Sequence, residues 1–123
     1  MVESKLKSVL IVEDDSIIRE TLRDILDFEG YQTHVACHGK EALDFLLSHS
    51  ANPDVILLDI MMPVMNGYQF RDEQLKDSVL SRIPTIVLSA DRSFHQTPGN
   101  QGFFKILKKP VDLEELLNLL ASF

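Results

Sequence analysis

The chain has 123 residues, of which 45% are hydrophobic and 25% charged, so its length and composition suit one globular domain with a buried core. Its 12 basic and 19 acidic side chains give a net charge of −7, which argues against non-specific binding to nucleic acid or to an anionic membrane. The single cysteine, Cys37, allows no internal disulfide, and no stretch resembles a signal peptide or a membrane span, so we expect a soluble cytoplasmic domain.

The first half of the chain alternates short apolar runs with amphipathic stretches. Strands are predicted over 8–12, 31–37 and 54–58, and helices over 16–28 and 39–48. The runs SVLIV and DVILL are apolar after their first residue, which is typical of strands buried on both faces of a sheet. Asp15 or Ser16 can cap the first helix, and Gly30 can end it.

The second half continues this alternation less regularly. Mixed helix and turn is predicted over 67–80, strands over 83–88 and 103–107, and a helix capped by Asp112 over 112–123. Residues 91–102 are polar, contain Pro98-Gly99 and show no helical stripe, so they are predicted to be mostly loop. The alternation predicts one α/β domain over 1–123, in which five parallel strands carry helices on both faces and the fourth helix is short or irregular.

Polar side chains follow most of the apolar strands. Ligands bind at the carboxyl ends of the strands in open parallel sheets, so these residues are candidates for a site. The candidates are Glu13, Asp14 and Asp15 after the first strand, Asp59 after the third, Ser89 and Ala90 after the fourth, and Lys108, Lys109 and Pro110 after the fifth. Clustered carboxylates repel one another, and a divalent cation such as Mg²⁺ would relieve that repulsion. A lysine would suit a phosphate, and Asp59 could itself accept a phosphoryl group.

Each of these residues has a simpler interpretation when it is taken alone. An aspartate after a strand is usually a cap or turn residue, Ser89 would be a structural hydroxyl, and Lys108 and Lys109 would be a solvated pair. The methionines at positions 61, 62 and 65 would serve packing. The simpler interpretations do not explain why four apolar strands each end on a group suited to a metal or a phosphate.

Four motifs in a fixed order carry a family resemblance. They are VLIVEDDSIIRETL (9–22), DVILLDIMMPVMNGYQF (54–70), IPTIVLSA (83–90) and KKPVDLEELL (108–117). Together they resemble the receiver domain of response regulators, the phosphoacceptor of two-component signalling, over essentially the whole chain. The resemblance implies a flavodoxin-like, doubly wound five-stranded sheet with strand order 2-1-3-4-5. It also implies a signalling domain that catalyses only its own phosphorylation and dephosphorylation, rather than an enzyme.

The resemblance also implies roles for individual residues. Asp59 would be phosphorylated by a sensor histidine kinase or a histidine phosphotransfer protein. Mg²⁺, or Mn²⁺ in its place, would be bound by Asp14 and Asp59 directly, by the backbone carbonyl of Met61, and by Glu13 through water. The spacing from Asp14 to Arg19 sets that register.

The remaining implied roles concern the switch and the loops. They are a switch hydroxyl at Ser89, space beside it at Ala90, a phosphate partner at Lys109 before a cis bond to Pro110, and loop shaping by Pro63 and Gly67. Phosphorylation would change an interaction surface, and a signalling partner that the sequence does not identify would bind that surface. A phosphorylation-dependent dimer is one form that this output could take. No direct contact with nucleic acid or membrane is expected.

The chain departs from the family pattern at its expected output surface. Ile106 stands three residues before Lys109, where the family usually has an aromatic switch residue, and the stretch from Ser89 to Lys109 is slightly short. One alternative is therefore a pseudo-receiver that binds partners without phosphorylation. Another is a Mg²⁺-dependent hydrolase with an aspartyl-phosphate intermediate, which is disfavoured because Met61 stands where such enzymes have a second acid.

Overall fold

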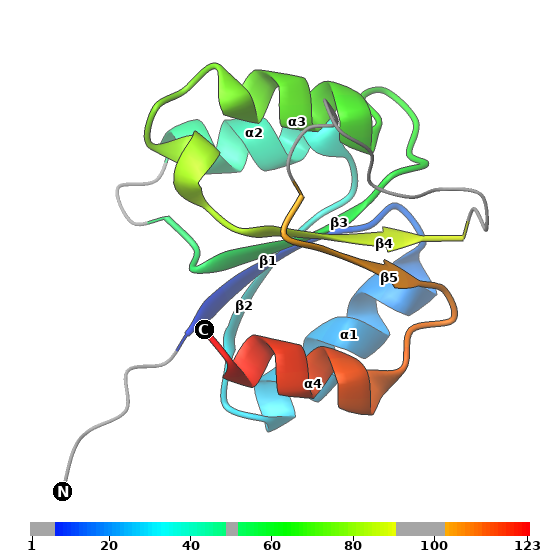
Figure 1. Cartoon of the computed structure of the whole chain (residues 1–123). Helices are drawn as coiled ribbons and strands as arrows, with labels where there is room; N and C mark the ends of the chain where they lie inside the picture. The colour runs from blue at the N-terminus through cyan, green and yellow to red at the C-terminus, as the bar shows by residue number, and fades with distance from the viewer. Residues whose placement is uncertain (1–6, 49–51, 91–102) are drawn as a thin grey trace, which may run out of the picture.

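A five-stranded parallel sheet forms the centre of the molecule (Figure 1). The computed structural model describes residues 7–48, 52–90 and 103–123. The strands are β1 (Ser8–Val12), β2 (Gln32–Ala36), β3 (Val55–Asp59), β4 (Thr85–Ser89) and β5 (Lys105–Lys108). Their order across the sheet is β2-β1-β3-β4-β5, which confirms the predicted flavodoxin-like topology. The predicted irregular segment over 91–102 lies outside the described residues.

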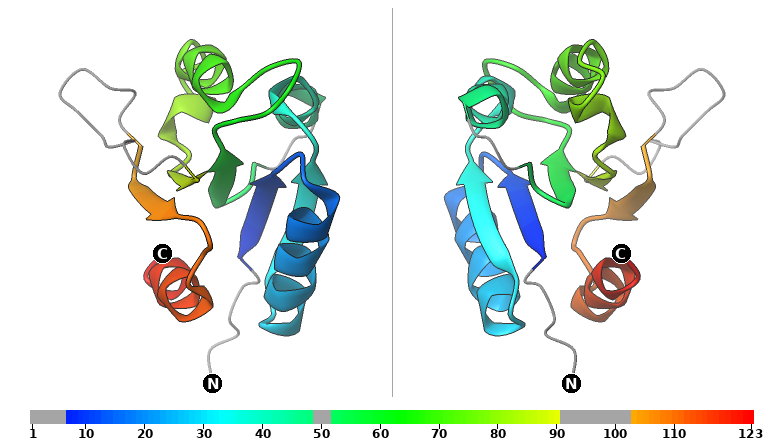
Figure 2. Two further views of the ribbon diagram at one scale, coloured as in Figure 1. Left: turned by 90° about the vertical axis from the view of Figure 1, so that its right-hand side faces the viewer. Right: turned by 90° about the vertical axis from the view of Figure 1, so that its left-hand side faces the viewer.

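Helices cover both faces of the sheet, as Figures 1 and 2 show. They are α1 (Ser16–Phe28), α2 (Gly39–Ser48), α3 (Gly67–Leu75), the short 3₁₀ helix η1 (Leu80–Arg82) and α4 (Leu113–Ala121). Helices α1 and α4 lie on one face, and α2 and α3 lie on the other. Within the described parts of the chain, no helix is long and apolar enough to cross a bilayer.

Two apolar cores result from the alternation of side chains along the strands, because successive residues point to opposite faces. On the side of α2 and α3, Leu10 and Leu58 pack with Phe70. On the side of α1 and α4, Ile11 and Leu57 pack with residues that include Leu22, Leu26, Leu116 and Leu120. Every residue of β3 and β4 is buried. β3 is apolar up to its last residue, Asp59, and β4 is apolar between its buried first residue, Thr85, and its last, Ser89.

The ends of α1 follow local rules. The Asp15 carboxylate accepts hydrogen bonds from the backbone N–H groups of Ile17 (2.9 Å) and Ile18 (3.0 Å), so Asp15, and not Ser16, is the cap. Gly30 ends the helix with φ +95°, a conformation that glycine adopts without steric cost, as predicted. The Asp15 cap therefore sets the point at which the chain leaves β1 and enters α1, and Gly30 sets the point at which it leaves α1.

The region predicted as mixed helix and turn consists of α3 and η1. Asn66 and Gln69 form a capping box at the start of α3. The buried Gln74 side chain donates a hydrogen bond to the carbonyl of Leu80 (2.8 Å) and so links α3 to η1. Strand β5 begins two residues later than predicted, and Phe103, where the strand was expected to start, is buried in the core ahead of it.

Candidate functional site

Three carboxylates meet at the carboxyl ends of β1 and β3. Oxygen atoms of Glu13, Asp14 and Asp59 all lie within 4.8 Å of one another. Glu13 and Asp59 are 1% and 4% exposed, whereas Asp14 is exposed to solvent. The two strands are neighbours in the sheet, and their parallel direction brings these residues to the same edge. We call Glu13, Asp14 and Asp59 the acidic cluster.

Lys109 contacts both buried members of the acidic cluster. Its Nζ lies 2.8 Å from Oε1 of Glu13 and 3.3 Å from Oδ1 of Asp59. Its backbone N–H donates to the carbonyl of Ser89 (2.8 Å), and its peptide bond to Pro110 is cis, as the resemblance implied. Because one lysine faces three carboxylates, the site keeps an excess of negative charge.

This excess of charge is visible in the pKa values of the site. The pKa of Asp59 is raised from 3.8 to about 7: burial is the largest cause, repulsion from Glu13 adds to it, and the nearby Lys109 partly offsets both. Burial lowers the pKa of Lys109, but the hydrogen bond to Glu13 and the charge of Asp59 outweigh burial, so its pKa is raised overall. Lys109 is therefore protonated at neutral pH, whereas Asp59 is only partly ionised.

The donor chemistry of the acidic cluster fits a hard divalent cation. Mg²⁺ prefers oxygen ligands and is usually held by one or two carboxylates together with water and phosphate oxygens. The acidic cluster offers carboxylate oxygens from both sides of the β1–β3 pair, with one member open to solvent. A cation would also offset the repulsion that raises the pKa of Asp59.

The other predicted site residues occupy neighbouring positions. Ser89 is the last residue of β4 and is buried, and Ala90 follows it at the surface. Asp59 pairs in register with Leu88, the residue before Ser89, so the two strands end side by side. Lys108, which Ser89 faces in β5, is exposed.

The loop after Asp59 is shaped by close backbone contacts. The N–H of Gly67 donates to the carbonyl of Ile60 (2.8 Å), and a Cβ added at Gly67 would lie 2.8 Å from the carbonyl oxygen of Asp59. Only glycine fits this approach without moving the backbone of Asp59. Pro63 is exposed, and its carbonyl accepts a hydrogen bond from the N–H of Met65 (2.7 Å).

The methionines of this loop do not behave alike. Met62 is buried and Met65 packs against the core, as predicted, but the Met61 side chain is 72% exposed. The prediction that all three serve packing is therefore wrong for Met61. Its side chain points to solvent because the chain turns at the surface after β3, and the role implied for its backbone carbonyl stays a prediction.

The contacts of Arg19 were not predicted from the sequence. Its spacing from Asp14 served only to decide which acidic residues match the metal-binding pair of the family. Nη1 of Arg19 donates to the backbone carbonyls of Glu13 (2.9 Å) and Asp14 (3.3 Å). Its place in the first turn of α1, five residues after Asp14, was the available signal. A long cationic side chain there can reach back to the carbonyls that end β1.

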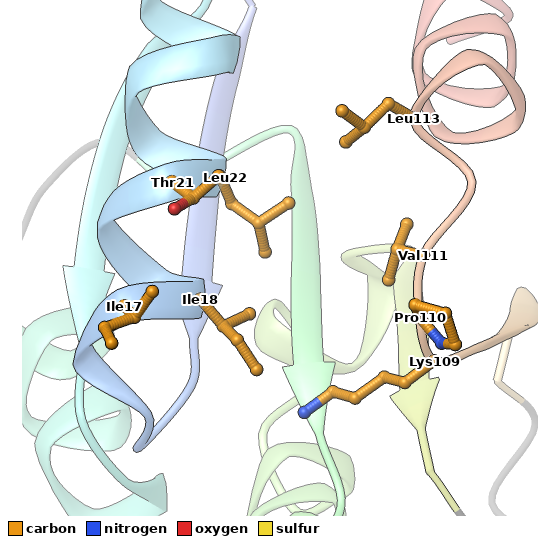
Figure 3. Close-up of a pocket in the computed structure, with 8 residues that line it drawn as sticks. All are labelled: Ile17, Ile18, Thr21, Leu22, Lys109, Pro110, Val111 and Leu113. Atoms are coloured by element: carbon orange, nitrogen blue, oxygen red, sulfur yellow. The ribbon is translucent and has the colours of Figure 1, made fainter.

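An apolar groove of about 280 Å³ lies beside Lys109 (Figure 3). It runs between the start of α1 and the loop from β5 to α4. Its lining residues are Ile17, Ile18, Thr21, Leu22, Lys109, Pro110, Val111 and Leu113. Ile17 is 78% exposed and Leu113 is 40% exposed, so apolar surface lies open next to the acidic cluster.

Comparisons with known proteins give one consistent family. A family model described as the response regulator receiver domain matches residues 9–121. The response regulator MprA of Mycolicibacterium vanbaalenii is 40% identical over 111 residues, which cover 89% of this chain and 46% of the relative. The probable transcriptional regulator ycf29 of Pyropia yezoensis is 35% identical over 119 residues, covering 93% and 51%. The chain thus spans about half the length of these curated relatives.

Solved structures agree with this match. The chemotaxis response regulator CheY4 of Vibrio cholerae superposes with a TM-score of 0.85 and 31% identity, covering 96% of this chain and 98% of that one. The receiver domain of the sensor histidine kinase PA1611 of Pseudomonas aeruginosa gives 0.83 and 26%, covering 96% and 97%. The latter structure has a magnesium ion coordinated in its active site cleft.

Proposed function

The chain belongs to the response regulator receiver family of two-component signalling, and from this premise we propose that Asp59 accepts a phosphoryl group in a Mg²⁺-dependent reaction. The donor is a sensor histidine kinase or a histidine phosphotransfer protein. One observation carries the proposal: three carboxylates lie within 4.8 Å of one another, and Lys109 contacts the two that are buried. Placing three carboxylates together is unfavourable for the stability of the fold, so the acidic cluster is better explained by a function than by a structural role.

The transfer needs an ionised carboxylate, and a cation bound at the acidic cluster would favour the ionised form of Asp59. An Asp59 oxygen attacks the phosphorus of the phosphohistidine as the P–N bond breaks, and the bonding electron pair returns to the imidazole nitrogen. The leaving imidazole nitrogen takes up a proton from solvent, so the products are an acyl phosphate on Asp59 and a neutral histidine on the donor. Lys109, kept protonated by its raised pKa, lies 3.3 Å from the Asp59 oxygen and is placed to pair with the incoming phosphoryl oxygens.

The acidic cluster would hold the metal, with the Met61 carbonyl as a further predicted ligand and Mn²⁺ as a substitute ion. When bound, Mg²⁺ neutralises charge on the acidic cluster and on the phosphoryl oxygens. Glu13 contributes a buried carboxylate that also holds Lys109 in place through the 2.8 Å contact. Asp14 contributes the exposed carboxylate, which leaves one side open for the donor.

Phosphorylation adds a charge of about −1.5 to −2 at a buried strand end. We propose that the Ser89 hydroxyl moves to bond the phosphoryl group, because β4 ends beside β3 and Ser89 is its last residue. Ala90, with its small side chain, leaves room for this movement. This movement changes the packing of the nearby surface, and a protein partner that the sequence does not identify binds the changed surface.

The apolar groove beside Lys109 suits contact with the donor protein. A donor histidine must come within bonding distance of Asp59, and Ile17 and Leu113 offer exposed apolar surface next to that point. A small-molecule phosphodonor such as acetyl phosphate would not need this surface. The two kinds of donor can therefore separate contact from chemistry.

The proposed function is tested by intact-mass spectrometry after incubation with acetyl phosphate, with Mg²⁺ or with EDTA. We expect one phosphoryl group on the parent with Mg²⁺ and none on Asp59→Asn. Asp44→Asn is the matched control, because Asp44 is an exposed carboxylate on α2 that contacts Lys40. A parent that gains no phosphoryl group from acetyl phosphate or from histidine kinases would refute the proposal and favour the pseudo-receiver alternative.

A further inference from the structure

Arg19 connects α1 to the backbone that presents two of the three carboxylates. Its side chain is 16% exposed, and its guanidinium reaches back across the first turn of the helix. Nη1 donates to the carbonyl of Glu13 at 2.9 Å and to that of Asp14 at 3.3 Å. One guanidinium nitrogen therefore joins consecutive carbonyls at the point where β1 ends.

The two carboxylates that follow from this backbone are held differently. The Glu13 side chain is buried and fixed, since Oε1 contacts Lys109 and Oε2 accepts a hydrogen bond from the N–H of Asp15 (3.2 Å). The Asp14 side chain is exposed. Its carboxylate is carried to the acidic cluster by the backbone of residues 13–15, and Arg19 bonds that backbone directly.

We propose that Arg19 is a positioning residue that sets the Mg²⁺ affinity of the acidic cluster by fixing the backbone of Glu13 and Asp14. The inference rests on the proposed function, because it assigns a determinant of the same metal site. Groups that orient metal ligands without touching the metal commonly change affinity by about 10- to 100-fold when they are removed. Arginine suits this task because its planar, permanently charged fork can serve more than one acceptor.

Charge alone predicts the opposite effect. Arg19 is a cation close to the acidic cluster, so it repels Mg²⁺, and removing its charge without any other change would strengthen Mg²⁺ binding. If positioning dominates, removing the side chain weakens binding. The sign of the change therefore separates the two roles.

The same helix offers a matched control. Arg23 lies one turn after Arg19, its side chain is 44% exposed, and it pairs with Glu20 at 3.9 Å. Arg19 contacts the same Glu20 at 3.7 Å. Arg23→Ala therefore removes one positive charge and one weak ion pair from α1, as Arg19→Ala does, but leaves the bonds to the carbonyls of residues 13 and 14 intact.

The experiment is calorimetric titration of Mg²⁺ into the full chain for the parent, Arg19→Ala, Arg19→Lys and Arg23→Ala. We expect Arg19→Ala to weaken binding about tenfold. We expect Arg23→Ala to leave affinity unchanged or slightly improved, and Arg19→Lys to fall between the parent and the alanine variant. Arg19→Ala binding as tightly as Arg23→Ala would overturn the inference.

Two further measurements keep the test decisive. In the absence of metal, amide hydrogen exchange at residues 13–15 should be faster in Arg19→Ala than in Arg23→Ala.

Thermal melts show whether each variant folds. If Arg19→Ala does not fold, Arg19→Lys takes its place in the titration, and an unchanged Mg²⁺ affinity of Arg19→Lys would overturn the inference. A parent that binds Mg²⁺ but gains no phosphoryl group would refute the proposed function while leaving the Arg19 comparison intact.

Discussion

Replacing Asp59 with asparagine is expected to stabilise the metal-free protein at neutral pH, although it removes the proposed phosphoacceptor. At an effective dielectric constant of about 20, carboxylates within 4.8 Å repel by about 3.5 kcal/mol or more, whereas the Lys109 contact at 3.3 Å attracts by about 5 kcal/mol. Asp59 meets two such repulsions and one attraction, and it also loses hydration on burial. The balance is unfavourable, in agreement with its raised pKa.

The magnitude follows from that pKa. A rise from 3.8 to about 7 corresponds to about 4 kcal/mol before solvent screening. Asp14 is exposed and the acidic cluster lies at an edge of the sheet, so we expect about 1–2 kcal/mol after screening. For a chain of 123 residues this raises the melting temperature of Asp59→Asn by about 4–8 °C.

The pH dependence has a definite sign. The folded state of the parent binds a proton on Asp59 more tightly than the unfolded state, so its free energy of unfolding falls as pH rises from about 4 to about 7. Asp59→Asn lacks this loss. The difference in melting temperature should therefore grow across this window and level off above it.

The assay is thermal unfolding in EDTA at several pH values from 5 to 8, with Asp44→Asn as the control for removing a carboxylate. The control should change little at any pH, because Asp44 and its partner Lys40 are both exposed. If Asp59→Asn melted at or below the parent temperature at pH 8, the argument that the acidic cluster is under net repulsion would be refuted.

Three further predictions concern the metal, the loop and the groove. Mg²⁺ at 100 times its dissociation constant should stabilise the parent by about 2.7 kcal/mol in thermal melts, and a full response in Asp14→Asn would contradict its role as a ligand. Gly67→Ala should destabilise the fold by about 1–3 kcal/mol and slow phosphorylation by acetyl phosphate, because its Cβ would press on the Asp59 carbonyl. Gly30→Ala is its control, because it should destabilise the fold by about 1 kcal/mol through its φ of +95° without changing the phosphorylation rate. Equal phosphorylation rates in the two variants would show that Gly67 does not act through Asp59. Ile17→Glu should slow transfer from a cognate histidine kinase about tenfold or more while leaving the acetyl phosphate rate within about twofold, and equal slowing with both donors would exclude a contact role for the groove.

Local sequence pattern was sufficient to predict most of the elements. The apolar runs that became β1, β3 and β4 are buried in the sheet, and Gly30 and Asp112 mark helix ends as predicted. These features depend on neighbours within a few residues, because strand periodicity, caps and left-handed turns are properties of a short backbone segment. Local pattern could not choose between Asp15 and Ser16 as the cap of α1. That choice depends on the geometry of the loop after β1, which the pattern of residue types does not contain.

Strand-end chemistry also identified the candidate residues, but only the tertiary structure brought them into contact. Lys109 is 96 residues from Glu13 and 50 from Asp59, and it contacts both because β1, β3 and β5 are parallel and end at the same edge of the sheet. This arrangement also sets the distances behind three other features of the site. They are the raised pKa of Asp59, the close approach of Gly67 to the Asp59 carbonyl, and the hydrogen bonds from Arg19 to the carbonyls after β1. Local sequence is enough to say which chemical groups reach the edge of the sheet. The packing of the strands decided how close those groups lie and how much water they keep, because both quantities depend on contacts between residues far apart in the chain.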